Sequence, residues 1–383
     1  MSAKAKIIVF SMIPVLVILG AGSLGFLLGR QSLIIPLANE IRTVMGATTL
    51  GKLLDSDEKK EVAAAYLEGH SSIAEMDEMS WAIFNVPTPF VGNGPMPGKH
   101  GNATINTMQF RVTAETVIPK PAGTFRIILT GGSTAFGSGA PAQNRTIGGY
   151  LEQLLTEVPT RDAIDRYEVV TAANPAWATT HERILIENRL SELEPDLVIS
   201  FSGNNDVHWG QTGSNVLWFR TYADEHYFRL IKKAYDYAGY GELPDVTRTN
   251  SKSVPPEIVA RRLLKNVSLS WFALKQEDIP HLFVLQPSLA VTGKALTSRE
   301  QTVLNSRIKQ HRNHVKYFQL CYAKISAALR SFNGDGYRFV SMAGIFDQLQ
   351  ADNEMFIDSY HFGDKGNQII AHKIYTEIQG LLK

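Results

Sequence analysis

Residues 127–137 read IILTGGSTAFG, an apolar run that ends in two glycines and a serine. The pattern predicts a buried strand over residues 125–130, then a sharp turn that the glycines permit, and then a helix. Sites of open α/β sheets lie beyond the carboxyl ends of their strands, so Ser133 is a candidate nucleophile at such an edge. A helix that begins there would aim its first amides at a developing anion, although the same residues also fit an ordinary turn or a phosphate cradle.

Two further motifs follow apolar runs and carry polar side chains. Residues 201–206 (FSGNND) continue from a predicted strand, and the side-chain amide of Asn205 can donate to an oxyanion there. Glycine and asparagine also favour a plain turn at a strand end. Residues 356–361 (FIDSYH) place Asp358 ahead of His361, at a spacing that lets the carboxylate fix the histidine tautomer and leave the other ring nitrogen basic. In a chain with ten histidines such a spacing also arises by chance, so the motif is informative only together with the others.

The chain around these motifs alternates short apolar runs with helical segments, which is typical of a parallel sheet with crossover helices. The predicted strands are residues 125–130, 167–171, 197–201, 281–286 and 338–341. The predicted helices are residues 147–156, 182–193, 300–330 and 366–382. The sequence therefore predicts a three-layer α/β/α sandwich with a central parallel sheet, and all three motifs follow predicted strands or precede a predicted helix.

In this order the motifs closely resemble those of the SGNH/GDSL hydrolases, the family of GDSL-like lipases and esterases. The resemblance covers roughly residues 104–383 and implies the flavodoxin-like sandwich of that family. The matching positions are Ser133 for the Gly-x-Ser nucleophile, residues 203–206 for the Gly-x-Asn-Asp block, Asp358 and His361 for the terminal Asp-x-x-His block, and residues 106–111 (NTMQFR) for an N-x-x-GFR arm.

The sequence departs from the family pattern in two places. Position 132 is glycine where the family name implies aspartate. The second block should read Asn-x-Gly-x-x-Gly, but this chain has Asn174, Ala176 and Thr179, so that Thr179 takes the place of the oxyanion glycine. Its backbone amide could still donate, because every residue except proline has one. The oxyanion or binding residues that the resemblance implies are thus Asn205, Gly203 and Thr179.

The implied reaction is acyl transfer, in which Ser133 attacks an ester carbonyl, His361 takes its proton and Asp358 stabilises the imidazolium. We expect an esterase that hydrolyses short-chain acyl esters, including carbohydrate-linked ones. One alternative is an acyltransferase that passes the acyl group to a glycan. Another is a non-catalytic subunit of a membrane-associated assembly, although a binding module need not keep the serine, asparagine, aspartate and histidine.

The composition of the chain argues against several classes of binding partner. The chain has 38 lysines and arginines against 37 aspartates and glutamates, which argues against a nucleic-acid-binding surface. Its single cysteine, Cys321, cannot form an internal disulfide, and no Cys/His cluster has the spacing of a zinc site. We therefore expect no metal and no cofactor, and a small-molecule or glycan ester as substrate.

The N-terminus predicts a membrane anchor. Residues 7–29 contain no charged side chain and are long enough to cross a bilayer core of about 30 Å. Lys4 and Lys6 precede them, which favours a cytoplasmic N-terminus and an exported remainder. A cleaved signal peptide is the alternative, but its apolar region is normally about 7–15 residues long. We expect residues 1–30 to be a single-pass anchor, with the catalytic domain periplasmic or extracellular.

The rest of the chain divides into two predicted parts. Residues 31–103 have a mixed charge run and then many prolines and glycines, which indicates a helical stalk followed by a linker. Residues 104–383 form the predicted hydrolase domain. Within it, residues 210–279 are too long for a simple connection, and such insertions are usually functional. We expect an inserted helical lid there, although its aromatic residues also fit a satellite core.

Overall fold

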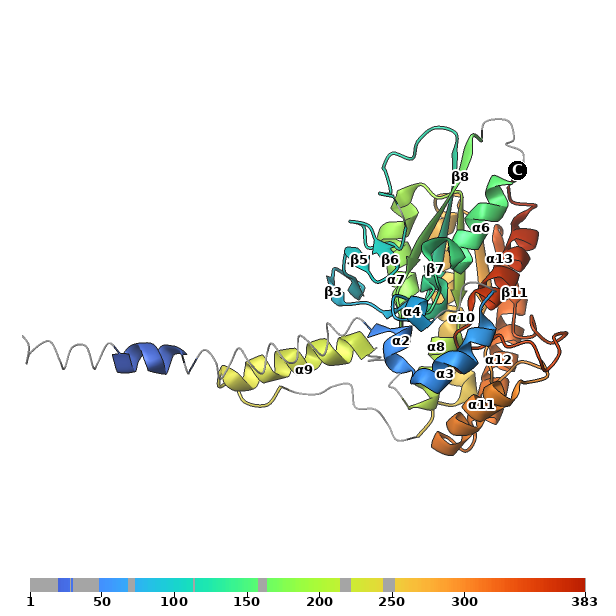
Figure 1. The fold of residues 1–383 in the computed structure, drawn as a ribbon. Coiled ribbons are helices and arrows are strands. Elements are labelled where there is room, and N and C mark those ends of the chain that lie inside the picture. Colours follow the sequence, from blue (N-terminus) through green and yellow to red (C-terminus); the bar gives the residue numbers. More distant parts are fainter. Residues whose placement is uncertain are drawn as a thin grey trace, which may run out of the picture. The chain divides into compact units, whose positions relative to one another are not determined.

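A parallel sheet forms the centre of the larger unit of the computed structural model, which describes residues 20–27, 29, 48–67, 73–112, 114–157, 164–213, 222–243 and 252–382. The five strands of the sheet have the order β11-β10-β9-β7-β8 (Figure 1). They are β7 (Thr124–Gly131), β8 (Arg166–Ala173), β9 (Leu197–Ser202), β10 (His281–Leu285) and β11 (Tyr337–Ser341). Each coincides with a predicted strand, and all neighbours pair in parallel, so the predicted sheet is confirmed.

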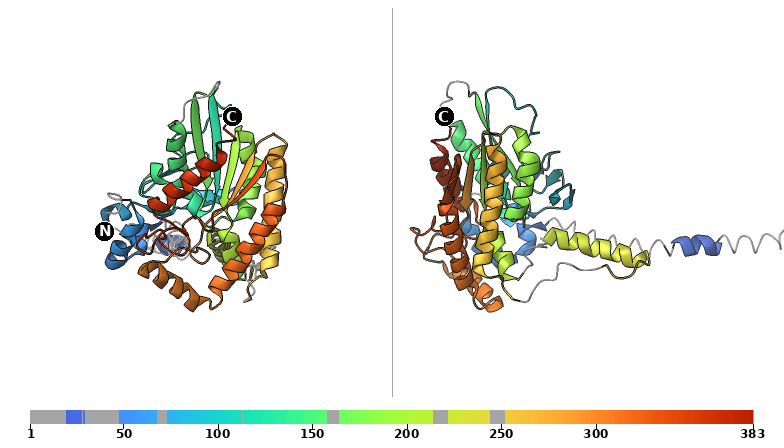
Figure 2. Two further views of the ribbon diagram at one scale, coloured as in Figure 1. Left: turned by 90° about the vertical axis from the view of Figure 1, so that its right-hand side faces the viewer. Right: turned by 180° about the vertical axis from the view of Figure 1, so that it is seen from behind.

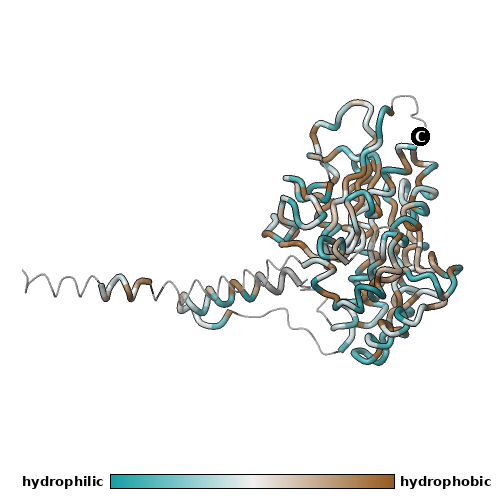
Figure 3. The backbone as a smooth tube through the Cα atoms, viewed as in Figure 1, coloured by the Kyte–Doolittle hydropathy of each residue, from teal (hydrophilic) through white to brown (hydrophobic). Residues whose placement is uncertain are grey.

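Helices cover both faces of this sheet (Figure 2). One face carries α6 (Ile147–Thr156) and α13 (Asp364–Ile378), and the other carries α7 (Thr179–Leu185), α10 (Pro256–Lys275) and α12 (His314–Ser331). Alternate residues of β7 face the two helix layers: Ile127 and Leu129 pack with α6 and α13, whereas Ile128 packs with α7. Because helices cover both faces, the central strands β7, β9 and β10 are buried along their whole length, and the interior of the unit is largely apolar (Figure 3).

Helix boundaries differ from the prediction in three places. Helix α13 ends at Ile378, four residues before the predicted end. The segment predicted as one helix over residues 300–330 is two helices, α11 (Ser298–Gln310) and α12, separated by residues 311–313. The segment predicted as residues 182–193 begins earlier, with α7, and continues as a π-helix (Ile186–Leu190) and a 3-10 turn (Ser191–Leu193).

The other described elements are β1 (Thr48–Thr49), α2 (Leu50–Leu53), α3 (Ser56–Val62), α4 (Ile73–Met76), β2 (Ser80–Ala82), β3 (Asn85–Thr88), β4 (Gly92–Pro95), β5 (Gly98–His100), β6 (Ala103–Ile105), α5 (Ser133–Phe136), α8 (Asn204–Gln211), α9 (Tyr222–Tyr237) and the 3-10 turns Ala63–Ala65 and Gln143–Arg145.

Residues 48–103 belong to the same unit as the parallel sheet, so the prediction of a separate stalk and linker is wrong for them. Val62 and Tyr66 pack in one hydrophobic cluster with Ile357, which lies near the end of the chain. The Tyr66 hydroxyl also donates to the carbonyl of Gly139 at 2.7 Å. The proline- and glycine-rich stretch forms the hairpins β3-β4 and β5-β6. Within the charge run that suggested a solvated helix, Lys59 is half-buried and pairs with Asp77 at 2.9 Å, whereas the other four residues are exposed.

The segment predicted as a lid is in part a layer of the sandwich. On α10, Leu263 and Val267 are buried in one cluster with Phe283 of β10, so this helix covers the sheet and the lid prediction is wrong for it. Most of α9 belongs to a separate unit, made of residues 1–45 and 225–244. For α9 the lid stays a prediction.

The predicted anchor at residues 1–30 falls largely outside the described residues, as does the predicted stalk before residue 48. In the part of the chain that the structure describes, no helix combines the length and the apolar character needed to cross a membrane. The anchor therefore stays a prediction from the sequence.

A buried ion pair at the start of α11 holds the chain segment that leads to the Asp-x-x-His motif. Lys294 Nζ and Glu300 Oε2 are 2.7 Å apart, and both side chains are 0% exposed. The other oxygen, Glu300 Oε1, accepts the backbone N–H of Met355 at 3.0 Å and of Phe356 at 3.2 Å. Arg299 Nη1 donates to the carbonyl of Phe356 at 2.8 Å. These contacts anchor the segment to the first turn of α11.

We expect Glu300→Ala to lower the free energy of unfolding by about 3–5 kcal/mol, because it leaves the Lys294 ammonium buried without its partner. Chemical denaturation of wild type and variant measures this loss. As a control, Lys60→Ala removes a pair with Asp57 whose side chains are 66% and 87% exposed, and should cost less than about 1 kcal/mol. Equal small losses in the two variants would contradict the structural role of Glu300.

Candidate active site

A glycine turn carries Ser133 out of the sheet. Ser133 is the first residue of α5, directly after β7. Gly131 has φ of 156°, and a Cβ at this position would lie 2.3 Å from the backbone oxygen of Phe201, so only glycine lets β7 approach β9 so closely. The chain leaves β7 for β8 on one side and later returns to β9 on the other. Ser133 thus lies at the switch point of the sheet, the usual place of sites in this architecture.

Ser133, His361 and Asp358 form a continuous chain of hydrogen bonds. Ser133 Oγ lies 2.7 Å from His361 Nε2, although the residues are 228 positions apart in sequence. His361 Nδ1 lies 2.9 Å from each carboxylate oxygen of Asp358. The prediction that the serine and histidine meet at the carboxyl edge of the parallel sheet is confirmed. The arrangement is that of a nucleophile, a base and a group that orients the base.

The Asp358 carboxylate is held in its ionised form. Burial by itself would raise its pKa, but the His361 ring and the backbone N–H groups of Tyr360 and His361 outweigh burial and lower the pKa to about 2. An ionised carboxylate only accepts hydrogen bonds, so it favours the tautomer with the proton on His361 Nδ1. Nε2 is then free to accept the Ser133 hydroxyl proton.

Trp81 forms an aromatic wall beside the histidine. The ring centroids of Trp81 and His361 are 4.4 Å apart, with 55° between the ring planes. The carbonyl of Trp81 accepts the hydroxyl of Ser138 at 2.6 Å, which joins β2 to the segment after α5. Trp81 is not among the predicted site residues because it lies in the predicted stalk and linker. The only local signal was the short apolar run WAIF at residues 81–84.

Asn205 lies against the turn that precedes the serine. Its Nδ2 donates to the carbonyl of Trp177 at 2.7 Å, which uses one of the two N–H groups of the amide. A Cβ at Gly132 would lie 2.5 Å from this same nitrogen, so glycine at a position where the resemblance implies aspartate permits the approach. Gly203 has φ of 105° and turns the chain from β9 into α8. Its predicted binding role stays a prediction.

The prediction that Thr179 supplies an oxyanion donor is wrong. Its backbone N–H donates to Asp206 Oδ2 at 3.1 Å, and its hydroxyl donates to Asp206 Oδ1 at 2.6 Å. Asn266 Nδ2 in turn donates to Thr179 Oγ1 at 2.9 Å. The Asp206 carboxylate thus accepts the hydrogen bond of the Thr179 amide that the family pattern would leave for an oxyanion. The sequence held no local sign of this partner.

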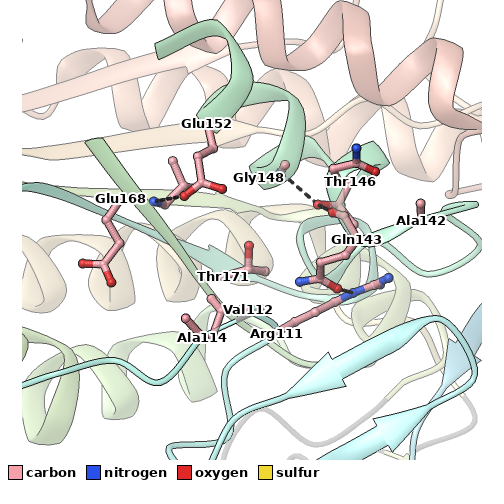
Figure 4. Close-up of a pocket in the computed structure, with 13 residues that line it drawn as sticks. Arg111, Val112, Ala114, Ala142, Gln143, Thr146, Gly148, Glu152, Glu168 and Thr171 are labelled. Carbon is pink, nitrogen blue, oxygen red and sulfur yellow. Dashed lines mark hydrogen bonds between the residues drawn. The ribbon is translucent and has the colours of Figure 1, made fainter. Parts of the chain in front are cut away.

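Arg111, from the NTMQFR arm, is buried and ties the far end of α5. Its Nη1 donates to the carbonyls of Phe136 at 2.9 Å and Gly137 at 2.8 Å, and its Nε donates to Gln143 Oε1 at 3.0 Å. Burial lowers the pKa of Arg111 to about 9, so the guanidinium remains charged at neutral pH. Figure 4 shows it in a cavity of about 390 Å³ whose wall also includes Glu152. The arm therefore holds the short helix that begins with the serine.

No protein-family model matches the sequence, and no curated protein matches it. Among solved structures, the chain is similar to a protein from Parabacteroides merdae described as a GDSL-like lipase, at 14% identity over 67% of this chain and 96% of the other, with a TM-score of 0.40. It is also similar to the acetyl xylan esterase AlAXEase, at 14% identity over 66% of this chain and 100% of the other, with a TM-score of 0.38. A family 3 carbohydrate esterase from Clostridium thermocellum matches at 13% identity over 68% and 97% of the two chains, with a TM-score of 0.36. These three structures are ester hydrolases by name, and one is named for the GDSL family that the sequence motifs resemble.

Proposed function

We propose that the chain is a serine hydrolase that cleaves acyl esters, including short-chain and carbohydrate-linked ones. The observation that carries the proposal is the hydrogen-bonded series from Ser133 Oγ through His361 to Asp358, with distances of 2.7 and 2.9 Å. The class of ester comes from the resemblance of the motifs to the SGNH/GDSL hydrolases. The charge-free residues 7–29 support a membrane anchor, and Lys4 and Lys6 ahead of them favour a catalytic domain outside the cytoplasm.

In the proposed reaction Ser133 Oγ attacks the ester carbonyl carbon while His361 Nε2 takes the hydroxyl proton. The bond to the alcohol then breaks, and His361 returns the proton to the leaving oxygen. In the second half, His361 deprotonates a water molecule that attacks the acyl-enzyme and releases the acid. Asp358 remains ionised throughout and stabilises the imidazolium that forms in each half.

Two donors are proposed to hold the negative charge on the carbonyl oxygen. The side chain of Asn205 has a second N–H besides the one that bonds to Trp177. The backbone N–H of Ser133 stands at the first position of α5, where a helix supplies no acceptor of its own. Such donors lower the barrier because they are already oriented when the charge develops.

An acyltransferase would use the same residues and differ only in its acceptor. The full-length chain should release free acetate from p-nitrophenyl acetate in the absence of any sugar. An acetyl release that depends on added sugar, with acetylated sugar as the product, would show the transferase instead.

We expect Ser133→Ala to lower the kcat for p-nitrophenyl acetate by at least about 10⁴-fold, because no other hydroxyl occupies its place. Asp358→Asn should cost about 10⁴-fold, since the amide favours the wrong histidine tautomer. Ser331→Ala changes an exposed serine of α12 and should retain the wild-type rate. A wild-type rate in Ser133→Ala would contradict the proposed mechanism.

The oxyanion assignment has its own test. Asn205→Ala should lower kcat by about 100- to 1000-fold with little change in KM, because the lost hydrogen bond forms mainly in the transition state. Asn188→Ala truncates an exposed asparagine of the π-helix and serves as the matched control. A rise in KM with unchanged kcat in Asn205→Ala would show that the amide binds the substrate in its ground state instead.

The pKa of Asp358 predicts an acid dependence of stability. The folded value of about 2 lies below the ordinary value of 3.8, so the unfolded chain binds the proton first as the pH falls. The stabilisation is fully present above about pH 4 and is lost between about pH 4 and pH 2. Thermal melts should therefore show the difference between wild type and Asp358→Asn shrinking across this window. A difference that stays constant with pH would contradict the shifted pKa.

A further inference from the structure

A second pocket lies between α7 and α10 and gathers cationic side chains. It has a volume of about 480 Å³, and its lining includes Thr180, Arg183, Arg261, Arg262, Lys265 and Asn266. We refer to this cavity as the basic pocket. Four of these six residues carry a positive charge, in a chain whose formal net charge is only +1. The charge is thus concentrated locally.

Two arginines of the basic pocket, Arg183 and Arg262, lie close enough for each charge to act on the other. On α7, Arg183 Nη1 lies 3.6 Å from Glu187, while Arg183 Nε is buried and has no acceptor among the described residues. Burial lowers the pKa of Arg262, the charge of Asp206 raises it, and the neighbouring Arg183 lowers it again. Arg262 Nη2 also donates to Thr180 Oγ1 at 3.4 Å, so this guanidinium lies at the pocket wall. The two guanidinium groups therefore repel each other across the pocket.

Arg261 and Lys265 add two further charges at the surface. Both side chains are exposed on α10, and within the described ranges neither forms an ion pair with a carboxylate. They stand one helical turn apart, so their side chains lie on the same face. An anion that entered the pocket would meet both of them.

Hydrogen bonds connect the basic pocket to the candidate active site. Asn266 Nδ2 lies within hydrogen-bond distance of two hydroxyls, 3.1 Å from Thr180 Oγ1 and 2.9 Å from Thr179 Oγ1. Thr179 in turn donates to Asp206, which follows Asn205 directly in the chain. The polar side of the pocket is therefore connected by hydrogen bonds to α8, the helix that carries the proposed oxyanion donor.

We propose that the basic pocket binds the acidic part of the molecule that carries the ester, an oxyanion group on a sugar-sized carrier. Guanidinium groups pair with carboxylates and phosphates through two parallel hydrogen bonds, and both kinds of anion suit this set of donors. A volume of about 480 Å³ falls in the range of pockets that enclose small molecules rather than a single ion. The link to the ester rests on the proposed function, whereas anion binding does not.

Titration calorimetry on full-length Ser133→Ala, which cannot turn over, tests the binding. Glucuronate and glucose 6-phosphate represent the two sources of charge, inorganic phosphate represents the free ion, and glucose is the neutral control. We expect both acidic sugars to bind more tightly than inorganic phosphate, glucose not to bind, and added salt to weaken binding. Binding of inorganic phosphate as tight as that of the sugars would overturn the assignment to a carrier.

Arg261→Gln with Lys265→Gln should weaken binding of the acidic sugars by at least about tenfold, through two lost charge-assisted contacts. Lys309→Gln with Arg330→Gln makes the same change in net charge at exposed positions of α11 and α12 outside the pocket lining. This control should stay within about twofold of the parent protein. Equal affinity in the two double variants, or no binding of any anion, would overturn the proposal.

A kinetic comparison in the Ser133 background tests the link to the ester. The ratio of kcat/KM for acetylated glucuronate to that for acetylated glucose should fall at least fivefold in Arg261→Gln/Lys265→Gln and keep its wild-type value in the control. An unchanged ratio of kcat/KM would show that the basic pocket does not bind the ester substrate. If the wild type hydrolyses neither of these esters nor p-nitrophenyl acetate, the proposed function fails, while the calorimetry still decides whether the pocket binds anions.

Discussion

A single hydrogen bond, between Ser133 Oγ and His361 Nε2, sets the requirement that the surrounding structure meets. It joins residues 228 positions apart, and a hydrogen bond weakens once its atoms separate beyond about 3.2 Å. The backbone must therefore be fixed on both sides. On the serine side, Gly131 packs β7 closely against β9. On the histidine side, Arg299 and Glu300 hold the segment before the motif.

Buried charged groups provide much of this positioning. Glu300 accepts two backbone amides, Arg111 donates to two backbone carbonyls, and Asp206 accepts the amide and hydroxyl of Thr179. Apolar packing is not directional, so it would stabilise these segments without fixing where each amide points. A buried charged side chain that is hydrogen-bonded to the backbone fixes the position of that segment, and losing the side chain is costly. Loops around the site thus acquire a definite geometry.

Sequence patterns performed well where the signal is local. A strand covered on both faces is apolar at nearly every position, and each predicted strand begins and ends within two residues of the observed one. The sequence patterns gave wrong predictions where a residue's position depends on a partner that is distant in the chain. The charges of α3 suggested a solvated stalk, yet Val62 on the same helix is buried with Ile357. Thr179 matched the position of the family's oxyanion glycine, yet its backbone N–H donates to Asp206, 27 residues later in the chain.

By itself the sequence determined the five strands, the class of fold and the three motifs that supply Ser133, Asn205 and the Asp358–His361 pair. These depend on periodicity and short spacing, which neighbouring residues encode. Only the tertiary structure decided the order of the strands, the contact of Trp81 with His361, the partner of Thr179 and the meeting of α7 with α10 in the basic pocket. Each of these joins residues far apart in the chain, and their contacts follow from the packing of whole layers rather than from any local pattern.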